Sequence, residues 1–336
     1  MSIYDVAKEA GVSTATVSRL INNSGYVGEE TRKKIEQAIE STGFSPGRLS
    51  HRKSSHAVFS VALLLEDVRL PTHASIVYGV ESKLFTLGAD IVVCNTGIDM
   101  RKFEQYVDSL KKKNVDAFII SGAVYDHALL GDSILKKLGK KPIIAINGMH
   151  DLKGDNVYHI FRDEEYGVRC AVEYFVKHGH KRIAYAGTDR VYSTGKIRRK
   201  EFLRVISEYG IINESNLYAF ESSFEGGMKW AKEIARTNEI PTAIFFDQSW
   251  IAAGAIRGFQ ECGLNVPEDI SVICLTDTGY SKYSSPGITT VEFSPEQIGV
   301  AAATIVGNIL DGDVIANDIS IRPTMIERES VRDFTK

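Results

Sequence analysis

The stretch Ser2–Asn22, SIYDVAKEAGVSTATVSRLIN, constrains the fold most, because its pattern predicts two short helices joined by a glycine turn. Apolar residues recur at helical spacing from Ile3 to Ala10, and Gly11 is the residue type that ends a helix in a left-handed turn. Ser13 is placed to cap a second helix from Thr14 to about Ile21. The sequence therefore predicts a helix-turn-helix.

The outward face of the second helix is short, polar and nearly free of acid, whereas Val17, Leu20 and Ile21 form its buried side. Such a face suits a helix N-terminus laid into the major groove of DNA, although an ordinary helical hairpin with a solvated face has the same spacing. We expect some of these side chains to select bases and the others to position the helix on phosphates. The base-selecting residues are Thr14, Ala15 and Arg19, and the positioning residues are Thr16, Ser18 and Asn22; Ser13 is also expected at the DNA interface.

Composition indicates a soluble protein of two or three domains. The chain has 336 residues, of which 43% are hydrophobic and 25% charged. Its longest apolar run, about Ala57–Leu65, is too short to span a bilayer, and no signal peptide precedes it, so we expect a cytoplasmic protein. The cysteines are far apart and are expected to be reduced core residues rather than zinc ligands or disulfides. They are Cys94, Cys170, Cys262 and Cys274.

Charge is distributed unevenly along the chain. Residues 1–56 contain eight Lys or Arg against six Asp or Glu, a surplus of two positive charges, whereas the whole chain has a net charge of −3. The remainder therefore carries −5. A mildly basic head on an acidic body fits a DNA-binding module attached to a part that avoids DNA.

A third helix over EETRKKIEQAIESTGF, ended by Gly43, is expected to close the core of the head. The following residues, 46–57, are a linker by composition and contain the basic side chains of Arg48, His51 and Lys53. Such a linker is either a solvated tether or a source of further phosphate contacts.

From Val58 onward, apolar strands alternate with helical patterns, as in VFSVALLL, DIVVCN and RIAYAG. This alternation predicts an α/β protein with two doubly wound parallel-sheet units, divided near residues 158–163. Ligand sites in such sheets lie at the carboxyl ends of the strands.

Several segments resemble the LacI/GalR family of transcription regulators: DVAKEAGVSTATVSRLIN in the head, then CNTGIDMRKFEQYVDSL, KHGHKRIAYAG, GLNVPEDISVI and PGITTVEFSPEQIG. The resemblance implies a periplasmic-binding-protein-type body that binds a small-molecule effector, and a homodimer that binds a pseudo-palindromic DNA operator. The expected divisions are a helix-turn-helix head at 1–45, a hinge at 46–57, an N-terminal subdomain at 58–160 plus 291–318, and a C-terminal subdomain at 161–290 plus 319–336.

The linker departs from the resembling family, in which a hinge helix inserts a leucine between base pairs of the minor groove. Lys53 stands at the leucine position, and Ser50 and His51 replace the usual Ala-Arg. A lysine cannot enter a base step without burying its charge, so we expect groove or phosphate contact with less DNA kinking.

The resemblance also places an effector pocket at the strand ends. Arg198 occupies the position of the family's ligand-binding arginine, Gln248 and Ser249 replace its Asn-Asp, and Thr276 precedes Asp277 where an aspartate is usual. These changes remove negative charge, which favours a phosphorylated or acidic sugar; drift after loss of effector control is the alternative. The expected pocket residues are His73, Asn147, Arg162, Arg198, Gln248, Ser249, Thr276 and Asp277.

Other chemistry finds little support in the sequence. The chain has no P-loop, no GxGxxG after its first strand and no nucleophile elbow, so we expect no cofactor, no metal and no catalytic residues. His178 and His180 are expected to belong to a structural turn. The sequence therefore favours a DNA-binding regulator, in this family most often a repressor, over a solute-binding or sugar-modifying protein.

Overall fold

The computed structural model of the protein describes residues 3–21, 25, 27–42, 59–122, 131–147, 152–188, 193–211, 217–237, 239–313 and 315–336. Among these residues, no helix is long and apolar enough to cross a membrane.

The head consists of three helices around a small core. Val6, Val17 and Ile35, one from each helix, are fully buried at 0% exposure, and Val12, Leu20 and Ile39 pack around them. The apolar spacing of the sequence thus becomes one closed core. The helices are α1 (Ile3–Glu9), α2 (Thr14–Ile21) and α3 (Glu29–Thr42).

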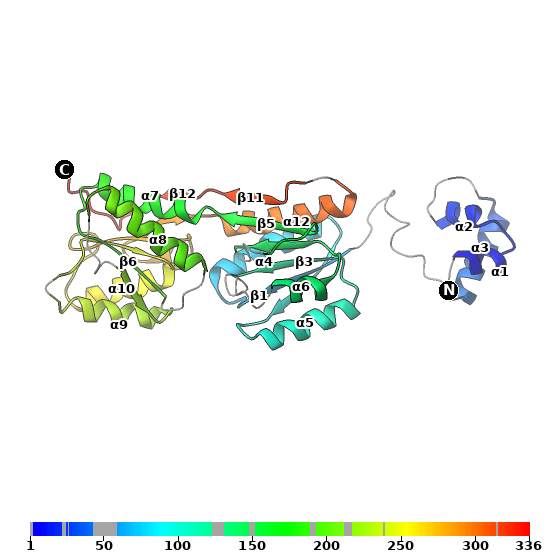
Figure 1. Ribbon diagram of the computed structural model, residues 1–336, viewed down its shortest axis with the longest axis horizontal. Helices are drawn as coiled ribbons and strands as arrows, with labels where there is room; N and C mark the ends of the chain where they lie inside the picture. The colour runs from blue at the N-terminus through cyan, green and yellow to red at the C-terminus, as the bar shows by residue number, and fades with distance from the viewer. Residues whose placement is uncertain are drawn as a thin grey trace.

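The first subdomain is a six-stranded sheet in the order β11-β5-β4-β3-β1-β2, with all neighbouring strands parallel. Helices α4 and α12 pack on one face, and α5 and α6 cover the other (Figure 1). The elements are β1 (Ser60–Leu65), α4 (Pro71–Thr86), β2 (Asp90–Asn95), α5 (Met100–Lys112), β3 (Ala117–Ser121), α6 (Gly131–Leu138), β4 (Ile143–Ile146), β5 (Val157–Arg162), α12 (Pro295–Asp311) and β11 (Asp318–Ile321).

The second subdomain repeats this plan in the order β12-β10-β9-β8-β6-β7, and only β12 runs antiparallel to its neighbour. Helices α7 and α8 cover one face, and α9 and α10 the other. The elements are α7 (Glu164–Lys177), β6 (Ile183–Thr188), α8 (Ser193–Glu208), β7 (Leu217–Phe220), α9 (Phe224–Ile234), β8 (Ala243–Phe246), α10 (Ser249–Glu261), β9 (Ser271–Leu275), α11 (Gly279–Tyr283), β10 (Thr289–Glu292) and β12 (Thr324–Ile326).

The chain crosses between the subdomains three times, after β5, after β10 and after β11 (Figure 1). The whole of β5 to Arg162 pairs in the first sheet, β10 to Glu292 in the second, and β11 to Ile321 in the first. These strand ends lie within a few residues of the boundaries expected at 160, 290 and 318. Hydrogen bonding between strands, such as the pairing of Ile321 with Arg162, decides where each strand ends.

One apolar core extends through both subdomains, because Val291 and Phe293 beside the second crossing join the two packed faces. The cysteines are free thiols, but only Cys94 and Cys274 are buried. Cys170 is half-buried, and Cys262 is exposed at the C-cap of α10. The expectation of four core cysteines was therefore wrong for Cys262, which ends a helix on the surface.

Candidate functional site

The turn between α1 and α2 has the geometry of a helix-turn-helix. Gly11 has a φ of 64°, in the left-handed region, and Val12 N–H donates to Ala7 O at 3.0 Å, which closes the end of α1. Ser13 Oγ then accepts from Thr16 N–H at 3.1 Å, so Ser13 caps α2 as its sequence position predicts.

The outward face of α2 exposes Ala15 and Arg19, while Thr14, Thr16 and Ser18 are half-buried. The Thr16 and Ser13 hydroxyls share a hydrogen bond of 2.8 Å, so both contribute to the start of the helix. The α2 surface therefore offers Arg19 as its long donor. Asn22, Arg48, His51 and Lys53 lie outside the described residues, and their DNA contacts stay predictions.

A cleft lies between the subdomains at the carboxyl ends of their strands. It contains a cavity of about 410 Å³, and a second hollow of about 340 Å³ adjoins it through Asn147, Arg162 and Thr194. Of the expected pocket residues, six line the larger cavity: His73, Asn147, Arg162, Arg198, Gln248 and Thr276.

Ser249 and Asp277 are not among the described residues that line the larger cavity, and each bonds to neighbouring side chains. Ser249 Oγ shares a hydrogen bond of 2.7 Å with Thr278 Oγ1 at the start of α10. Asp277 accepts from Ser281 Oγ and Arg328 Nη2, both at 2.8 Å. Asp277 thus ties α11 to the C-terminal segment, outside the described lining of the cleft.

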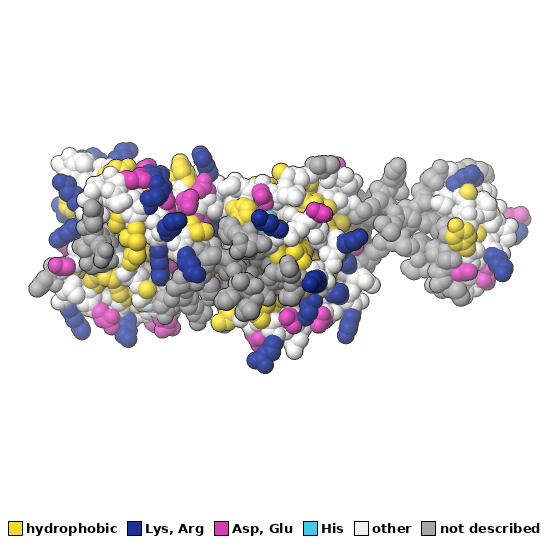
Figure 2. Space-filling model, in the orientation of Figure 1, with side chains coloured by type: hydrophobic (Ala, Val, Ile, Leu, Met, Phe, Trp, Pro, Cys, Tyr) yellow, Lys and Arg dark blue, Asp and Glu magenta, His cyan; other side chains and the backbone are white. Residues whose placement is uncertain are grey.

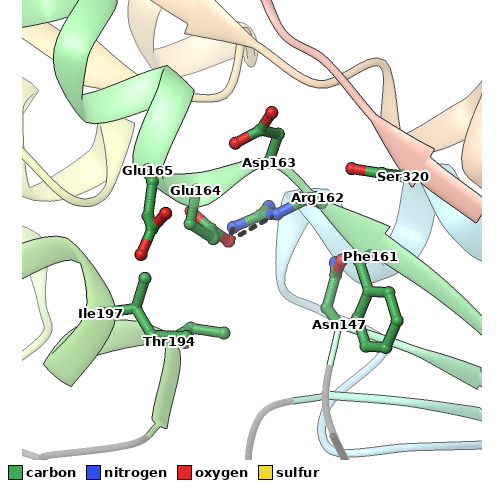
Figure 3. Close-up of a pocket in the computed structure, with 9 residues that line it drawn as sticks. All are labelled: Asn147, Phe161, Arg162, Asp163, Glu164, Glu165, Thr194, Ile197 and Ser320. Atoms are coloured by element: carbon green, nitrogen blue, oxygen red, sulfur yellow. Dashed lines mark hydrogen bonds and ion pairs between the residues drawn. The ribbon is translucent and has the colours of Figure 1, made fainter. Parts of the chain in front are cut away.

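Glu164 binds both arginines of the cleft, and its bond to Arg162 is drawn in Figure 3. Its carboxylate accepts from Arg162 Nε at 2.9 Å and from Arg198 Nε and Nη2 at 2.8 and 3.1 Å. Burial would raise the pKa of Glu164, but the two guanidinium charges outweigh burial and hold this pKa at about 2. Arg198, which the resemblance places in the effector pocket, thus already donates to Glu164.

Arg162 also connects the subdomains. It is the last residue of β5 in the first sheet, and its partner Glu164 begins α7 of the second subdomain. Its guanidinium lies 4.6 Å from the centre of the Phe293 ring, beside the second crossing. The Arg162–Glu164–Arg198 cluster therefore spans the junction across which the subdomains would move.

His73 contributes no positive charge to the cleft near neutral pH. Burial lowers its pKa, and the hydrogen bond from its Nδ1 to Asp67 O, at 3.1 Å, offsets this only in part. The ring therefore acts as a neutral donor at the start of α4.

Of the cleft residues that were not predicted from the sequence, Asp247, Trp250 and Glu164 bear most on the chemistry of the site. Asp247 directly follows β8, one residue before Gln248, and Trp250 lies in the first turn of α10. Glu164 is an acid in the first turn of α7, as is common at a helix N-terminus. Its sequence position therefore did not indicate that it also binds the two arginines. The position of Asp247 at a strand end was the signal that could have identified it.

The cleft keeps negative charge even though Ser249 and Thr276 replace the family's usual aspartates. Among the described residues that line the larger cavity, four are acids and two are arginines, and both arginines bind Glu164. The acids are Glu66, Asp67, Glu221 and Asp247. Asp67 is in turn bonded to Arg69 at 2.6 Å. The other three acids still outnumber the two arginines, so a phosphorylated or acidic ligand would meet more negative than positive charge.

Comparisons with known proteins agree with this architecture. Residues 2–47 match the family model of bacterial regulatory proteins, lacI family, and residues 172–331 match that of a periplasmic binding protein-like domain. The HTH-type transcriptional repressor PurR of Pasteurella multocida is 31% identical over 336 residues, which cover 98% of each protein. PurR of Pectobacterium carotovorum is 31% identical over 334 residues, covering 99% of this chain and 97% of the relative.

Solved structures share the fold. A lac repressor dimer bound to operator and an anti-inducer has a TM-score of 0.73 at 23% identity, covering 99% of both chains. The transcriptional regulator CelR in complex with cellobiose has a TM-score of 0.69 at 22% identity, covering 98% of this chain and 99% of that one. On the strength of the full-length similarity to the PurR repressors, this chain belongs to the lacI family of bacterial regulatory proteins.

Proposed function

We propose that this transcription regulator is a homodimeric repressor that binds a pseudo-palindromic operator and is controlled by a small molecule, a sugar or sugar derivative, in the cleft. The observation that carries the proposal is that one chain combines a helix-turn-helix with a cleft lined from both subdomains. A molecule that bridges the cleft favours one relative position of the subdomains. It can change DNA binding only if its own affinity differs between the two positions.

DNA binding is assigned to the exposed face of α2. Ala15 and Arg19 are exposed there, and Val17 holds the helix in the core of the head. On the face of the body drawn in Figure 2, Lys and Arg are interspersed with Asp and Glu over both subdomains, which does not form a track for the DNA backbone. The head is therefore the DNA-reading part.

The dimer is assigned to the first subdomain. Tyr78 and Phe85 on α4 are 61% and 79% exposed, and Val93 on β2 and Ile98 just after it are 40% and 55% exposed. Strand β2 is also the edge of its sheet, so apolar side chains and an unpaired strand edge lie on adjoining elements. A second copy of the chain would cover both.

Light scattering tests the dimer. The wild type should have the mass of two chains, and Phe85→Glu should shift it toward one chain at micromolar concentration. Leu203→Glu is the matched control, because Leu203 is a 40% exposed apolar residue on α8 of the other subdomain. A wild-type monomer that protects a single half-site on DNA would contradict the proposal.

The cleft is assigned to binding rather than to catalysis. The ring of His73 is bonded to the backbone, and Asp247 and Glu164 are held by Thr188 N–H and by two arginines. None of these three described groups forms a base–nucleophile pair with a cleft hydroxyl.

Mapping the sites that the protein occupies across the source genome tests the function as a whole. Occupied sites should share a palindrome with half-sites about one helical turn apart. They should lie before genes for transport or breakdown of the effector, which the adjoining genes would then identify. Occupancy without any shared sequence would contradict the proposal.

A further inference from the structure

Asp247 presents an unsatisfied acceptor to the cleft. Its side chain is 2% exposed, and Oδ2 accepts from Thr188 N–H at 3.1 Å. Among the described residues, Oδ1 has no hydrogen-bond partner, although Asp247 lines the larger cavity. A buried acceptor without a partner destabilises the unliganded protein. A ligand that donates to Oδ1 would supply the missing hydrogen bond, which would favour its binding.

The backbone fixes the position of this carboxylate. Asp247 N–H donates to Ala186 O at 3.1 Å, which extends the pairing of β8 with β6. The carboxylate lies over Gly187, where an added Cβ would come within 2.5 Å of Oδ2. A glycine at 187 is therefore what gives the Asp247 side chain its room.

Two further buried polar atoms without a partner belong to residues of the first subdomain that line the cavity. Ser121 Oγ, at the end of β3, and Asn147 Oδ1, just after β4, have no partner among the described residues. The Asn147 backbone has a φ of 54°, a conformation that non-glycine residues seldom adopt. Acceptors at the strand ends of both subdomains thus converge on one cavity.

The charges of the cleft favour the same kind of ligand. Both arginines are bound to Glu164, while Asp247 is one of four acids in the lining. Burial raises the pKa of Asp247, and the charge of Arg198 offsets this only in part. A ligand that donates a proton-bearing group to Asp247 stabilises its ionised form, whereas an anion would destabilise it.

We propose that the effector is an uncharged or positively charged molecule that donates hydrogen bonds to Asp247 in the second subdomain and to Asn147 in the first. Asp247 is then the residue that selects against anionic molecules. This inference rests on the proposed effector control and reverses the expectation of a phosphorylated or acidic sugar.

A small-molecule extract sorted by charge tests the inference and does not require the effector to be identified first. A DNA duplex is first selected from a random pool by the wild-type protein. A deproteinised small-molecule extract of the source bacterium is then passed over an anion exchanger, and the unretained and retained fractions are added to the protein–DNA complex. The activity that changes DNA affinity should be in the unretained fraction.

Variants then test whether Asp247 and Asn147 bind the active molecule. Asp247→Asn and Asn147→Ala should each require about tenfold or more of the active fraction for the same response, while still binding the duplex. Asp313→Asn, at an exposed loop position, is the matched control and should respond as the wild type. Thermal unfolding of each variant shows whether it is folded, and binding of the duplex shows that its head is functional.

The outcomes separate this inference from the proposed function. Activity in the retained fraction would overturn the inference and leave effector control standing. A wild-type response by Asp247→Asn would also overturn it. If neither fraction alters binding to a duplex that the protein does bind, effector control itself fails and the inference fails with it.

Discussion

Replacing Glu164 with glutamine should destabilise the protein strongly at neutral pH, because Glu164 is the only acid bonded to both cleft arginines among the described residues. The side chains of Arg162 and Arg198 are 8% and 6% exposed. Glutamine keeps the size of the side chain but removes its charge. Two buried guanidinium groups would then face each other without a carboxylate bonded to either, and the charges of Glu292 and Asp247 would offset this only from a distance.

The size of the effect follows from two independent arguments. The pKa of Glu164 is lowered from 4.5 to about 2, which at 1.36 kcal/mol per pKa unit is about 3 kcal/mol of stabilisation of the ionised form. Removing one partner from a buried ion pair costs roughly 3–5 kcal/mol in other proteins. We therefore expect Glu164→Gln to lose about 3 kcal/mol of unfolding free energy at pH 7.

The direction of the pKa shift of Glu164 also determines how the stability difference changes with pH. A carboxyl whose folded-state pKa is lowered stabilises the fold above its unfolded pKa, and this contribution is lost as the pH falls from about 4.5 to about 2. The difference in stability between the wild type and Glu164→Gln should thus be full at pH 7 and shrink below about pH 4.5.

Urea unfolding at several pH values, followed by circular dichroism, measures this difference. Glu165→Gln is the matched control, because Glu165 is the next residue of α7 and is exposed. The control should stay within about 0.5 kcal/mol of the wild type. A Glu164→Gln variant as stable as the control at pH 7 would refute the assignment of Glu164 as the charge that holds both arginines.

Three further predictions concern the cleft and the hinge. Asp247→Asn should raise the melting temperature at pH 8 and leave it nearly unchanged at pH 4, because a buried carboxyl with a raised pKa destabilises the fold only once it ionises. The charged and titratable groups that act on it are Arg198, Arg199, Glu164 and Tyr185. Calorimetry that shows the same change at both pH values would contradict this. Gly187→Ala should weaken the effector response with the duplex still bound, because the added Cβ meets Asp247 Oδ2; an unaltered response in the DNA-affinity assay would count against it. Lys53→Leu should bend operator fragments more than the wild type does in gel mobility, and equal strong bending by both would mean that another residue forms the wedge.

The sequence was sufficient to predict the helices and strands that depend on local residue patterns. Helical spacing and Gly11 located α1 and α2, and strand–helix alternation predicted the two sheets. The exact strand ends beside the crossings depend on pairing with distant strands, so the sequence could place the crossings only to within a few residues.

Pairing between distant residues could not be predicted from the sequence. Arg198 bonds to Glu164, 34 residues earlier, and Asp277 bonds to Arg328, 51 residues later. Each partner is set by the tertiary fold, so the sequence gave no sign that Arg198 on α8 or Asp277 after β9 is already bonded. Asp247 was not predicted, because the family's usual Asn-Asp corresponds to Gln248 and Ser249, which directly follow it.

Binding of the selected duplex by Arg19→Ala at fixed salt tests the central claim, that α2 reads DNA, most directly. Arg19 is exposed on α2 and is the one side chain expected to grip a guanine edge by two hydrogen bonds. Its loss should cost about 1–3 kcal/mol and relax the preference at one base pair, whereas Arg32→Ala, which removes the same charge from α3, should leave base preference unchanged. Equal affinity and selectivity of Arg19→Ala and the wild type would contradict the account.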